Sequence, residues 1–403
     1  MQSQRSDHPA GGLSIGSRIE FRRRQCGLSR RVVANLVGRS EEWLRLVEIG
    51  RQSLDSVRLI VRLADVLRIE NIGELIEWPT HHTLTRPDDG RKIVSSYAQA
   101  LLSGDPPPSS GDVSLNSLNA DLSRCIEIWE SSAKPYTLTV EILPSLIAGS
   151  NHLYWMTHDP SVGQVSVRAH QLACMLLSRL GSFTIAVIAA ERCVNVAKSV
   201  GEPILVATSS LHRASAMLAL GHSLQSIYLS HSANKPYTVD FREMAIEGSR
   251  LLVAATAAAG KNDVRAADEC IDRAIGIANN LRVESRVGEF NFGMTAIGLT
   301  RMKIALLRSE IAEIPRIAAL MEIPESYPPA CISEFHIILA YAFCQKNEDV
   351  AAAYSLSRAA DLCPEEIFLN PCAREVIEIL IHRQNNLVRQ DITRLLSRIA
   401  LFD

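Results

Sequence analysis

The chain has 403 residues, of which 47% are apolar, and its 42 Lys and Arg are balanced by 44 Asp and Glu, which gives a net charge of −2. This composition excludes a largely disordered chain, and the length is sufficient for two or three domains. No apolar run approaches the ~18–20 residues that a membrane helix needs, and Met1–Gly12 lacks the apolar core of a secretory signal. We therefore expect a cytoplasmic protein with no membrane partner and a disordered tail over residues 1–12.

The near-zero net charge conceals an uneven distribution along the chain. Met1–Trp78 contains 13 Arg, no Lys and 10 acidic residues, a net charge of +3, which leaves −5 for the rest of the chain. Within the first 60 residues alone the net charge is +5. A basic end on an acidic remainder predicts that the two parts bind different partners, the basic part a polyanion.

Leu13–Trp78 has the apolar spacing of five short helical segments, enough for a small domain. Ser29 and Ser40 are placed to cap the second and third segments, and Gly50 suits the left-handed position that ends the third. The breaks between the segments are Cys26-Gly27, Gly38, Gly50 and Arg68–Asn71. The predicted core residues are Ile15, Ile19, Val33, Ala34, Leu36, Leu44, Val47, Ile60, Leu63, Ala64, Leu67, Ile72, Leu75 and Ile76.

Several short motifs follow one another in this region at a specific spacing. They are Gly27-Leu28-Ser29, Ala34-Asn35-Leu36-Val37-Gly38, Ser40 with Trp43-Leu44, Val47-Glu48-Ile49-Gly50-Arg51 and Arg62-Leu63-Ala64-Asp65-Val66-Leu67. In this order they resemble the lambda-repressor-like helix-turn-helix family, also called the xenobiotic-response-element family. The resemblance covers about one sixth of the chain and implies double-stranded DNA as a partner.

The resemblance also implies a role for individual residues, because the second helix of this motif crosses the phosphate backbone and the third presents its first turn to base edges. Arg45 could bind guanine through two hydrogen bonds, and a glutamate could accept one from a cytosine amine. Arg22–Arg24 and Arg51 would contact phosphates, which fix register without reading sequence. The implied DNA-binding residues are Arg30, Arg31, Ser40, Glu41, Glu42, Arg45, Arg51, Arg22, Arg23 and Arg24.

Each of these assignments has an ordinary structural alternative. Glu41 and Glu42 are also the residues that a helix dipole favours in a first turn, and arginines on an exposed helix are commonly solvated surface. Trp43 is expected to pack rather than to contact a base. Family members usually have glutamine at the position of Arg30 and an apolar residue at that of Arg22, so the base preference of the family is not transferred.

From Val165 onward the chain contains loosely repeated helix pairs. Leu180-Gly181, Leu220-Gly221 and Ala259-Gly260 each end a helix, at intervals of 40 and 39 residues. A helix pair of this kind buries its apolar stripe by stacking on its neighbours, which predicts an α-solenoid or, alternatively, a plain helical bundle. The pairs resemble tetratricopeptide repeats, with a period longer than the standard ~34 residues. Further predicted helices are Ile185–Ser199, Val264–Asn279, Phe292–Leu307, Ile311–Met321, Ile337–Gln345 and Val350–Leu362.

The predicted fold class is therefore all-α, with a five-helix helix-turn-helix domain at 13–78, a linker and first helix at 79–112, and a repeat domain at 113–403. The motifs Glu289–Asn291, Phe292-Gly293, Leu339–Ala342 and Ala359–Glu366 add a resemblance to actinobacterial regulators, and the layout resembles the peptide-pheromone-responsive regulators of Gram-positive bacteria. These resemblances imply a homodimer that senses a peptide, metabolite or protein in a concave groove. The candidate groove residues, each also explicable as an ordinary surface or interior group, are His170, His212, Glu247, Asn291 and Thr295.

No motif of a common enzyme class is present, and we expect no cofactor and no metal. Gly260-Lys261 lacks the other residues of a phosphate-binding loop, the nine cysteines form no C-x-x-C pair, and His81-His82 lies in a proline-bounded linker. Two hypotheses remain. The protein is a dimeric, ligand-responsive transcription regulator, or it is a protein-interaction scaffold whose helix-turn-helix domain no longer binds DNA.

Overall fold

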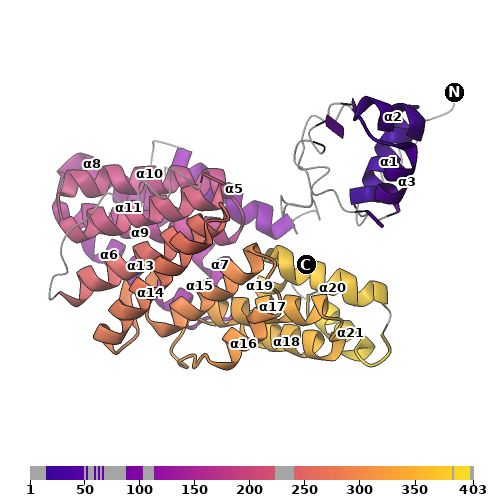
Figure 1. Cartoon of the computed structure of the whole chain (residues 1–403). Helices are drawn as coiled ribbons and strands as arrows, with labels where there is room; N and C mark the ends of the chain where they lie inside the picture. Colours follow the sequence, from indigo (N-terminus) through magenta and orange to yellow (C-terminus); the bar gives the residue numbers. More distant parts are fainter. Residues whose placement is uncertain are drawn as a thin grey trace. The chain divides into compact units, whose positions relative to one another are not determined.

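The computed structural model describes residues 15–49, 51–52, 59, 62–63, 66–67, 88–102, 113–222, 240–383 and 385–399 (Figure 1). The chain divides into two compact units, Met1–Leu84 and Thr85–Asp403, so that the division falls close to the predicted domain end at Trp78. The predicted tail, the cap at Gly50, the fifth helical segment and His81-His82 lie outside the described residues.

Tight turns separate successive helices in the described part of the N-terminal unit. Gly27 and Gly38 have φ angles of +67° and +73° in these turns, a left-handed backbone that favours glycine because it has no Cβ. The turns therefore fall at the two breaks predicted from the sequence. The helices are α1 (Ile15–Gln25), α2 (Arg30–Leu36) and α3 (Glu41–Glu48).

Two serines cap the second and third helices. The Ser29 hydroxyl accepts a hydrogen bond from the Val32 amide at 3.3 Å, and the Ser40 hydroxyl accepts one from the Trp43 amide at 3.1 Å. These bonds satisfy amides of the first turn that have no partner within the helix. Both predicted caps are confirmed.

The core of the N-terminal unit differs from the prediction at Leu36, which is 59% exposed. Val33, Ala34 and Val37 share one face of α2 at helical spacing, and Leu36 lies beside that face. Val37 is therefore the core residue in this turn, and the assignment of Leu36 was wrong. Among the described residues of this unit, the buried apolar ones are Ile19, Val33, Ala34, Val37, Leu44, Val47, Leu63 and Leu67.

The described residues of the second unit are helical almost throughout, which confirms the predicted all-α class. Its helices are α5 (Asp88–Leu102), α6 (Leu115–Ser131), α7 (Pro135–Val140), α8 (Leu143–Thr157), α9 (Pro160–Arg179), α10 (Phe183–Val200), α11 (Pro203–Ala219), α13 (Phe241–Ala259), α14 (Val264–Leu281), α15 (Met294–Leu307), α16 (Glu313–Ala319), α17 (Pro329–Gln345), α18 (Asp349–Leu362), α19 (Pro364–Leu369), α20 (Pro371–Arg383) and α21 (Arg389–Ile399). Within the described ranges, no helix is long and apolar enough to cross a bilayer.

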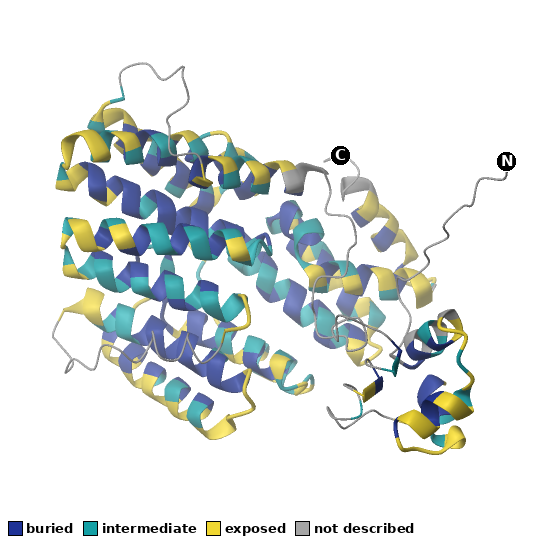
Figure 2. Ribbon diagram, turned by 90° about the horizontal axis from the view of Figure 1, so that it is seen from above, coloured by how far each residue is buried: buried dark blue, intermediate teal, exposed yellow. Residues whose placement is uncertain are grey.

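Successive helices of this unit pack as pairs, notably α9 with α10, α13 with α14 and α17 with α18. Small side chains bring the paired helices together, and the inner faces form the buried bands visible in Figure 2. On α10 alone the alanines Ala186, Ala189, Ala190 and Ala197 are fully buried. The body is thus a stack of helix pairs of the repeat kind that the sequence predicts, although α17 begins at Pro329, ahead of the predicted Ile337.

A short hairpin interrupts the helices between α14 and α15. Its strands are β1 (Ser285–Val287) and β2 (Phe290–Phe292), which pair antiparallel with Val287 opposite Phe290. Gly288 begins the two-residue turn with φ +58°, as such tight hairpin turns require. The predicted helix from Phe292 therefore starts later, at Met294, because Phe292 belongs to the hairpin.

Candidate nucleic-acid interface

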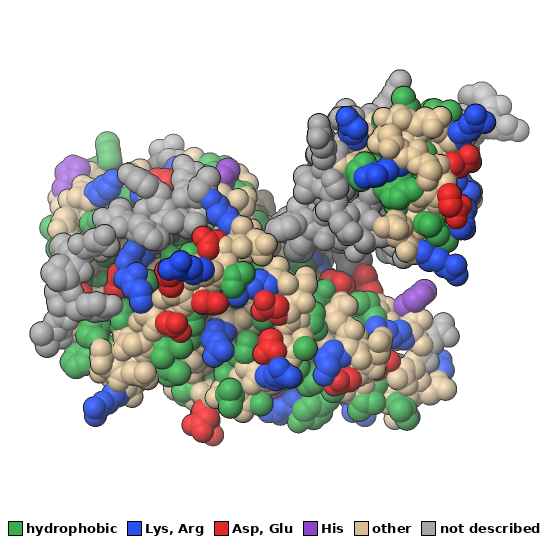
Figure 3. Space-filling view, in the orientation of Figure 1, with side chains coloured by type: hydrophobic (Ala, Val, Ile, Leu, Met, Phe, Trp, Pro, Cys, Tyr) green, Lys and Arg blue, Asp and Glu red, His purple; other side chains and the backbone are tan. Residues whose placement is uncertain are grey.

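The third helix of the N-terminal unit has one buried and one exposed face. Leu44 and Val47 are buried in the core, whereas Glu41 and Glu42 in the first turn are exposed. Arg45 also reaches solvent, with 42% of its side chain exposed. The helix therefore presents carboxylates and a guanidinium on the face opposite its core contacts, and Figure 3 shows acidic and basic side chains side by side on this unit.

Arg45 is bound to Glu42 of the same helix. Its Nε donates to Glu42 Oε2 at 2.8 Å and its Nη2 donates to Glu42 Oε1 at 2.6 Å. The hydrogen bond from Arg45 lowers the pKa of Glu42, so the carboxylate stays ionised at neutral pH. Because the pair is exposed to water it is weak, and a stronger acceptor can replace Glu42 as the partner of Arg45.

Arg23 is not a surface residue, in contrast to its predicted phosphate contact. Its side chain is 8% exposed, and its Nε and Nη2 donate to the two oxygens of Glu48 at 2.6 Å and 3.2 Å. Its Nη1 also donates to the Leu28 carbonyl at 2.9 Å. All of its nitrogens thus bond within the domain, and we correct its role to one of joining α1 to α3.

Arg30 belongs to the same cluster of charges. Its Nε donates to Glu48 Oε2 at 2.6 Å and its Nη2 to Glu20 Oε1 at 3.2 Å, so it links α2 to both α3 and α1. The hydrogen bond that Arg30 donates to Glu48 raises the pKa of Arg30. Arg24, whose side chain is 70% exposed, binds the same Glu20 oxygen at 2.6 Å. Arg30 is thereby held by two carboxylates, with about a third of its side chain left at the surface.

The other predicted phosphate-contacting residues lie at the surface of the unit. Arg31 is exposed in the first turn of α2, and Arg51 is exposed just after α3. Arg22 is half-buried on α1. Their positions are compatible with phosphate contacts, which remain predictions.

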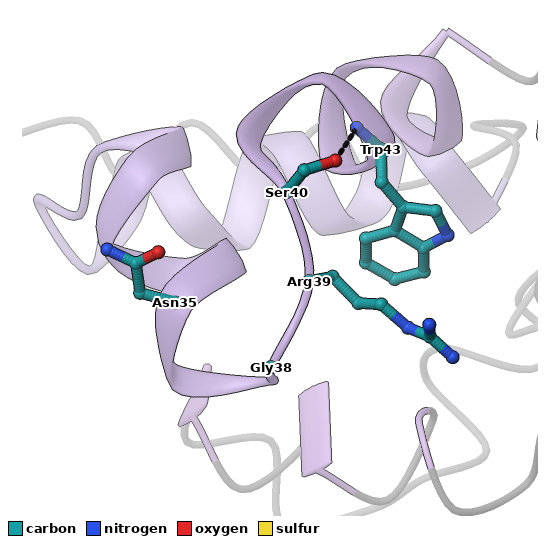
Figure 4. Close-up of a pocket in the computed structure, with 5 residues that line it drawn as sticks. All are labelled: Asn35, Gly38, Arg39, Ser40 and Trp43. Carbon is teal, nitrogen blue, oxygen red and sulfur yellow. Dashed lines mark hydrogen bonds between the residues drawn. The ribbon is translucent and has the colours of Figure 1, made fainter.

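A hollow of about 410 Å³ lies at the turn between α2 and α3. Figure 4 shows the Arg39 side chain extending beneath the Trp43 indole, and the guanidinium carbon is 5.8 Å from the ring centroid, a cation–π distance. Trp43 also packs on the core, as predicted. The residues that line the hollow are Asn35, Gly38, Arg39, Ser40 and Trp43.

Arg39 and Asn35 are not among the DNA-binding residues that the resemblance implies. Arg39 immediately precedes the cap residue Ser40 and is exposed, so that it lies beside the amino end of α3. The position of Arg39 in the sequence could have identified it, because a residue just before the recognition helix lies near the same DNA groove as the first turn of that helix.

In the second unit, two of the candidate effector-binding residues are interior histidines. His170 is fully buried on α9, with Nδ1 2.7 Å from the Ser166 carbonyl oxygen, and burial lowers its pKa to about 4. His212 is buried on α11 against the Phe290 ring, and burial lowers its pKa to about 3. Neither lies on an open surface: His170 is enclosed within the body, and the hairpin that carries Phe290 covers His212.

The remaining candidates also have partners within the chain. Glu247 on α13 pairs with Arg250 and, at 3.5 Å, with Arg273. Thr295 is buried at the start of α15, where its amide donates to Glu284 Oε1 at 2.8 Å. Asn291 lies in β2 of the hairpin. The structure therefore does not place the five residues along one open groove. Among the described residues, no cluster of His, Cys, Asp and Glu could hold a metal ion.

Comparison with known proteins agrees with the N-terminal geometry. Residues 14–76 match the family model described as "Helix-turn-helix domain". No curated protein matches the chain. One solved structure with some similarity is the crystal structure of Bacillus thuringiensis PlcR in complex with the peptide PapR7 and DNA. It is 11% identical to this chain, and the match covers 84% of this chain and 99% of that one. The TM-score is only 0.29. The match over residues 14–76 confirms that the N-terminal part of this chain is a helix-turn-helix domain.

Proposed function

We propose that the protein is a sequence-specific transcription regulator that binds double-stranded DNA as a homodimer and responds to an effector bound by its helical body. The observation that carries the proposal is the exposed face of α3, where Arg45 and Glu42 lie opposite the buried Leu44 and Val47. In a helix-turn-helix domain this is the face that enters the major groove.

The pairing of Arg45 with Glu42 suggests how bases are read. Guanine offers O6 and N7 as acceptors in the spacing of a guanidinium, so it can replace the two carboxylate oxygens that Arg45 binds in the free protein. Glu42 is then released, and it or Glu41 can accept a hydrogen bond from a cytosine amine. The planar guanidinium presents its donors in a fixed fork, so little side-chain freedom is lost per hydrogen bond formed.

Phosphate contacts would fix the register of the domain. Arg31 and Arg51 are exposed near the two ends of the α2–α3 pair, and Arg22 and Arg24 lie on α1. Arg39, held against Trp43, adds a cation beside the amino end of α3. Several such contacts release condensed counterions, so binding must weaken as salt rises.

A single domain of this size buries little surface on a half-site, which favours a dimer on a two-fold symmetric site. The helical body is the natural dimerisation and effector-binding part, because it supplies most of the chain and carries the net negative charge. An effector would act through its different affinity for two dimer arrangements that set the separation of the DNA domains. A regulator of this kind would act in the cytoplasm, on the nucleoid when bound to DNA.

A gel shift of the full chain on the DNA upstream of its own gene tests the proposal. With about 4–6 phosphate contacts, a fourfold rise in salt should lower the affinity by on the order of 10²–10³-fold. Absence of any DNA binding by a folded dimer would instead support the scaffold hypothesis.

The Arg45→Ala variant tests whether Arg45 recognises DNA bases. It should weaken binding to the specific site by roughly 1–3 kcal/mol and leave the dimer intact. Arg265→Ala is a matched control, since Arg265 is likewise an exposed helical arginine paired with a glutamate, Glu269, but lies on α14 of the body. If both variants bind as the wild type does, Arg45 does not read bases.

A further inference from the structure

The hairpin β1–β2 covers side chains of three helices that each begin a pair, α9, α11 and α13. A Cβ added at Gly288 would lie 3.1 Å from Gln171 Oε1 of α9 and 3.6 Å from Thr208 Cβ of α11. Phe290 lies on the His212 ring of α11, with ring centroids 4.4 Å apart. The hairpin thus crosses from one repeat to the next along the layer of first helices.

On α13 the contact is tighter still. The ring of Phe292 occupies the place that a side chain at Gly248 would take, so the aromatic ring rests directly on the helix backbone. Phe292 is fully buried there. Each aromatic side chain of β2 therefore packs on a different helix: Phe290 on the His212 ring of α11, and Phe292 on the backbone of α13 at Gly248.

Charged groups hold the other strand and the turn. Arg286 of β1 pairs with Glu130 of α6 and with Glu289 of the turn. The Glu289 side chain is completely buried, and its Oε1 lies 3.9 Å from Arg168 Nη2 of α9, too far for a hydrogen bond. A buried carboxylate is thus only partly matched by the arginine that faces it.

Several polar atoms in and beneath the hairpin are buried without a hydrogen-bond partner. Gln171 Oε1, His212 Nε2 and Glu289 Oε1 are buried and have no hydrogen-bond partner among the described residues. Elsewhere on the same helices, His170 Nε2 of α9 and Ser249 Oγ of α13 are also buried without a partner in the described part of the chain. Buried polar groups normally have partners, so Gln171 Oε1 and His212 Nε2 are two atoms of this face that a ligand could satisfy once the hairpin leaves it.

We propose that the face formed by α9, α11 and α13 is a binding site for an extended peptide and that the hairpin is its intramolecular occupant. The ligand class is a peptide with an acidic side chain next to an aromatic one, as in Glu289-Phe290. Such a peptide can approach Arg168 fully, place its ring on His212 and supply an N–H to Gln171 Oε1. The proposal rests on the proposed function, in which such a peptide is the effector.

The hairpin competes with a free peptide for the face of α9, α11 and α13, because it belongs to the same chain as these helices. The hairpin is present at a high effective concentration, so a free peptide binds only as often as the hairpin leaves the face. Its release is transmitted to the next repeat, because β2 ends at Phe292 and α15 begins at Met294. Binding of the peptide and repositioning of α15 are thereby one event.

The test uses a fluorescein-labelled octapeptide with the sequence of Ser285–Phe292 and the full chain, measured by fluorescence anisotropy without DNA. A protein variant with Glu289→Gln and Phe290→Ala weakens the hold of the hairpin and should bind the peptide at least tenfold more tightly than the wild type. The same peptide carrying these two substitutions should bind neither protein, and adding Arg168→Ala to the variant should abolish binding. Equal binding by wild type and variant, or no binding by a variant with wild-type circular dichroism, overturns the proposal.

Hydrogen exchange on the wild type keeps the proposal testable if the variant does not fold. The amides of residues 285–292 should exchange through local opening that is insensitive to low urea, while those of α9 exchange only on global unfolding. Exchange of both segments in one global step contradicts a displaceable hairpin. Because neither readout involves DNA, a negative gel shift would refute the proposed function and leave these results interpretable.

Discussion

Arg179 of α9 and Glu366 of α19 form an ion pair at 2.8 Å between side chains 187 positions apart. Arg179 also binds Glu334 of α17 at 3.1 Å and the Tyr136 hydroxyl of α7 at 2.9 Å. The Arg179 cluster, defined by these four residues, therefore joins the beginning of the body to its later repeats. It supplies a long-range tie that nearest-neighbour stacking of repeats does not provide.

Replacing Arg179 by methionine should lower the free energy of unfolding of the body by about 3–5 kcal/mol, because buried carboxylates lose their counter-charge. Urea denaturation followed by circular dichroism measures the change. Arg265→Met, which breaks an exposed pair on α14, serves as the control and should have little effect. Adding Glu366→Gln to Arg179→Met should restore part of the stability, and a loss below about 1 kcal/mol in the single variant would contradict the role of the cluster.

Acidification should destabilise the body through its interior histidines. Burial lowers the pKa of His170 to about 4 and that of His212 to about 3, from 6.5. Below pH 6.5 the unfolded chain binds protons that the folded chain does not, so stability falls as the pH drops from 6.5 toward 4. Each histidine contributes about 1.4 kcal/mol per pH unit in that window, or roughly 4 kcal/mol for the two between about pH 7 and pH 5.

Urea midpoints at about pH 7 and pH 5 check this expectation. His212→Phe keeps an aromatic ring against Phe290 and should remove about half of the pH dependence. His152→Gln, at an exposed position on α8, should leave the dependence unchanged. A pH dependence equal in all three proteins would show that other groups control acid unfolding.

The parts of the fold that the sequence predicted are those set by short-range chemistry. Ser29 and Ser40 each cap a helix by accepting a hydrogen bond from the amide three residues later. Gly27 and Gly38 have the left-handed backbone angles that commonly end a helix. These features need no knowledge of the rest of the chain. The same holds for the repeat seams, where alanines at helical spacing identify the contact face of α10.

The errors arose where a distant partner decides the role of a side chain. Arg23 was expected to contact phosphate because of its position in the resemblance, but Glu48, 25 positions away, makes its burial favourable. His170 and His212 were expected in a groove because they are polar residues on first helices. No local pattern indicated the hairpin that covers His212, since each of its strands has only three residues.

Glu48→Gln should destabilise the helix-turn-helix domain by about 3–5 kcal/mol, because it leaves the guanidinium of Arg23 buried without a counter-charge. The Glu48 side chain is fully buried and binds both Arg23 and Arg30 at 2.6 Å. Hydrogen exchange of the α1–α3 amides in the full chain measures the loss. Glu42→Gln, the same change at an exposed site in the same unit, is the matched control. Similar exchange in the two variants would show that the buried cluster does not stabilise the domain.

Arg39→Ala should weaken DNA binding on every sequence alike, because a guanidinium beside the first turn of α3 can reach a phosphate but is not part of the base-reading face. The slope of log affinity against log salt should decrease by about 1, and the preference for the specific site should be kept. Trp43→Phe should have a smaller effect in the same direction, since Phe retains a ring for Arg39 to rest on. Arg316→Ala, an exposed arginine of α16 in the body, is the control. Loss of sequence preference in Arg39→Ala at an unchanged salt slope would instead make Arg39 a base-reading residue and move the recognition surface from α3 toward the turn that precedes it.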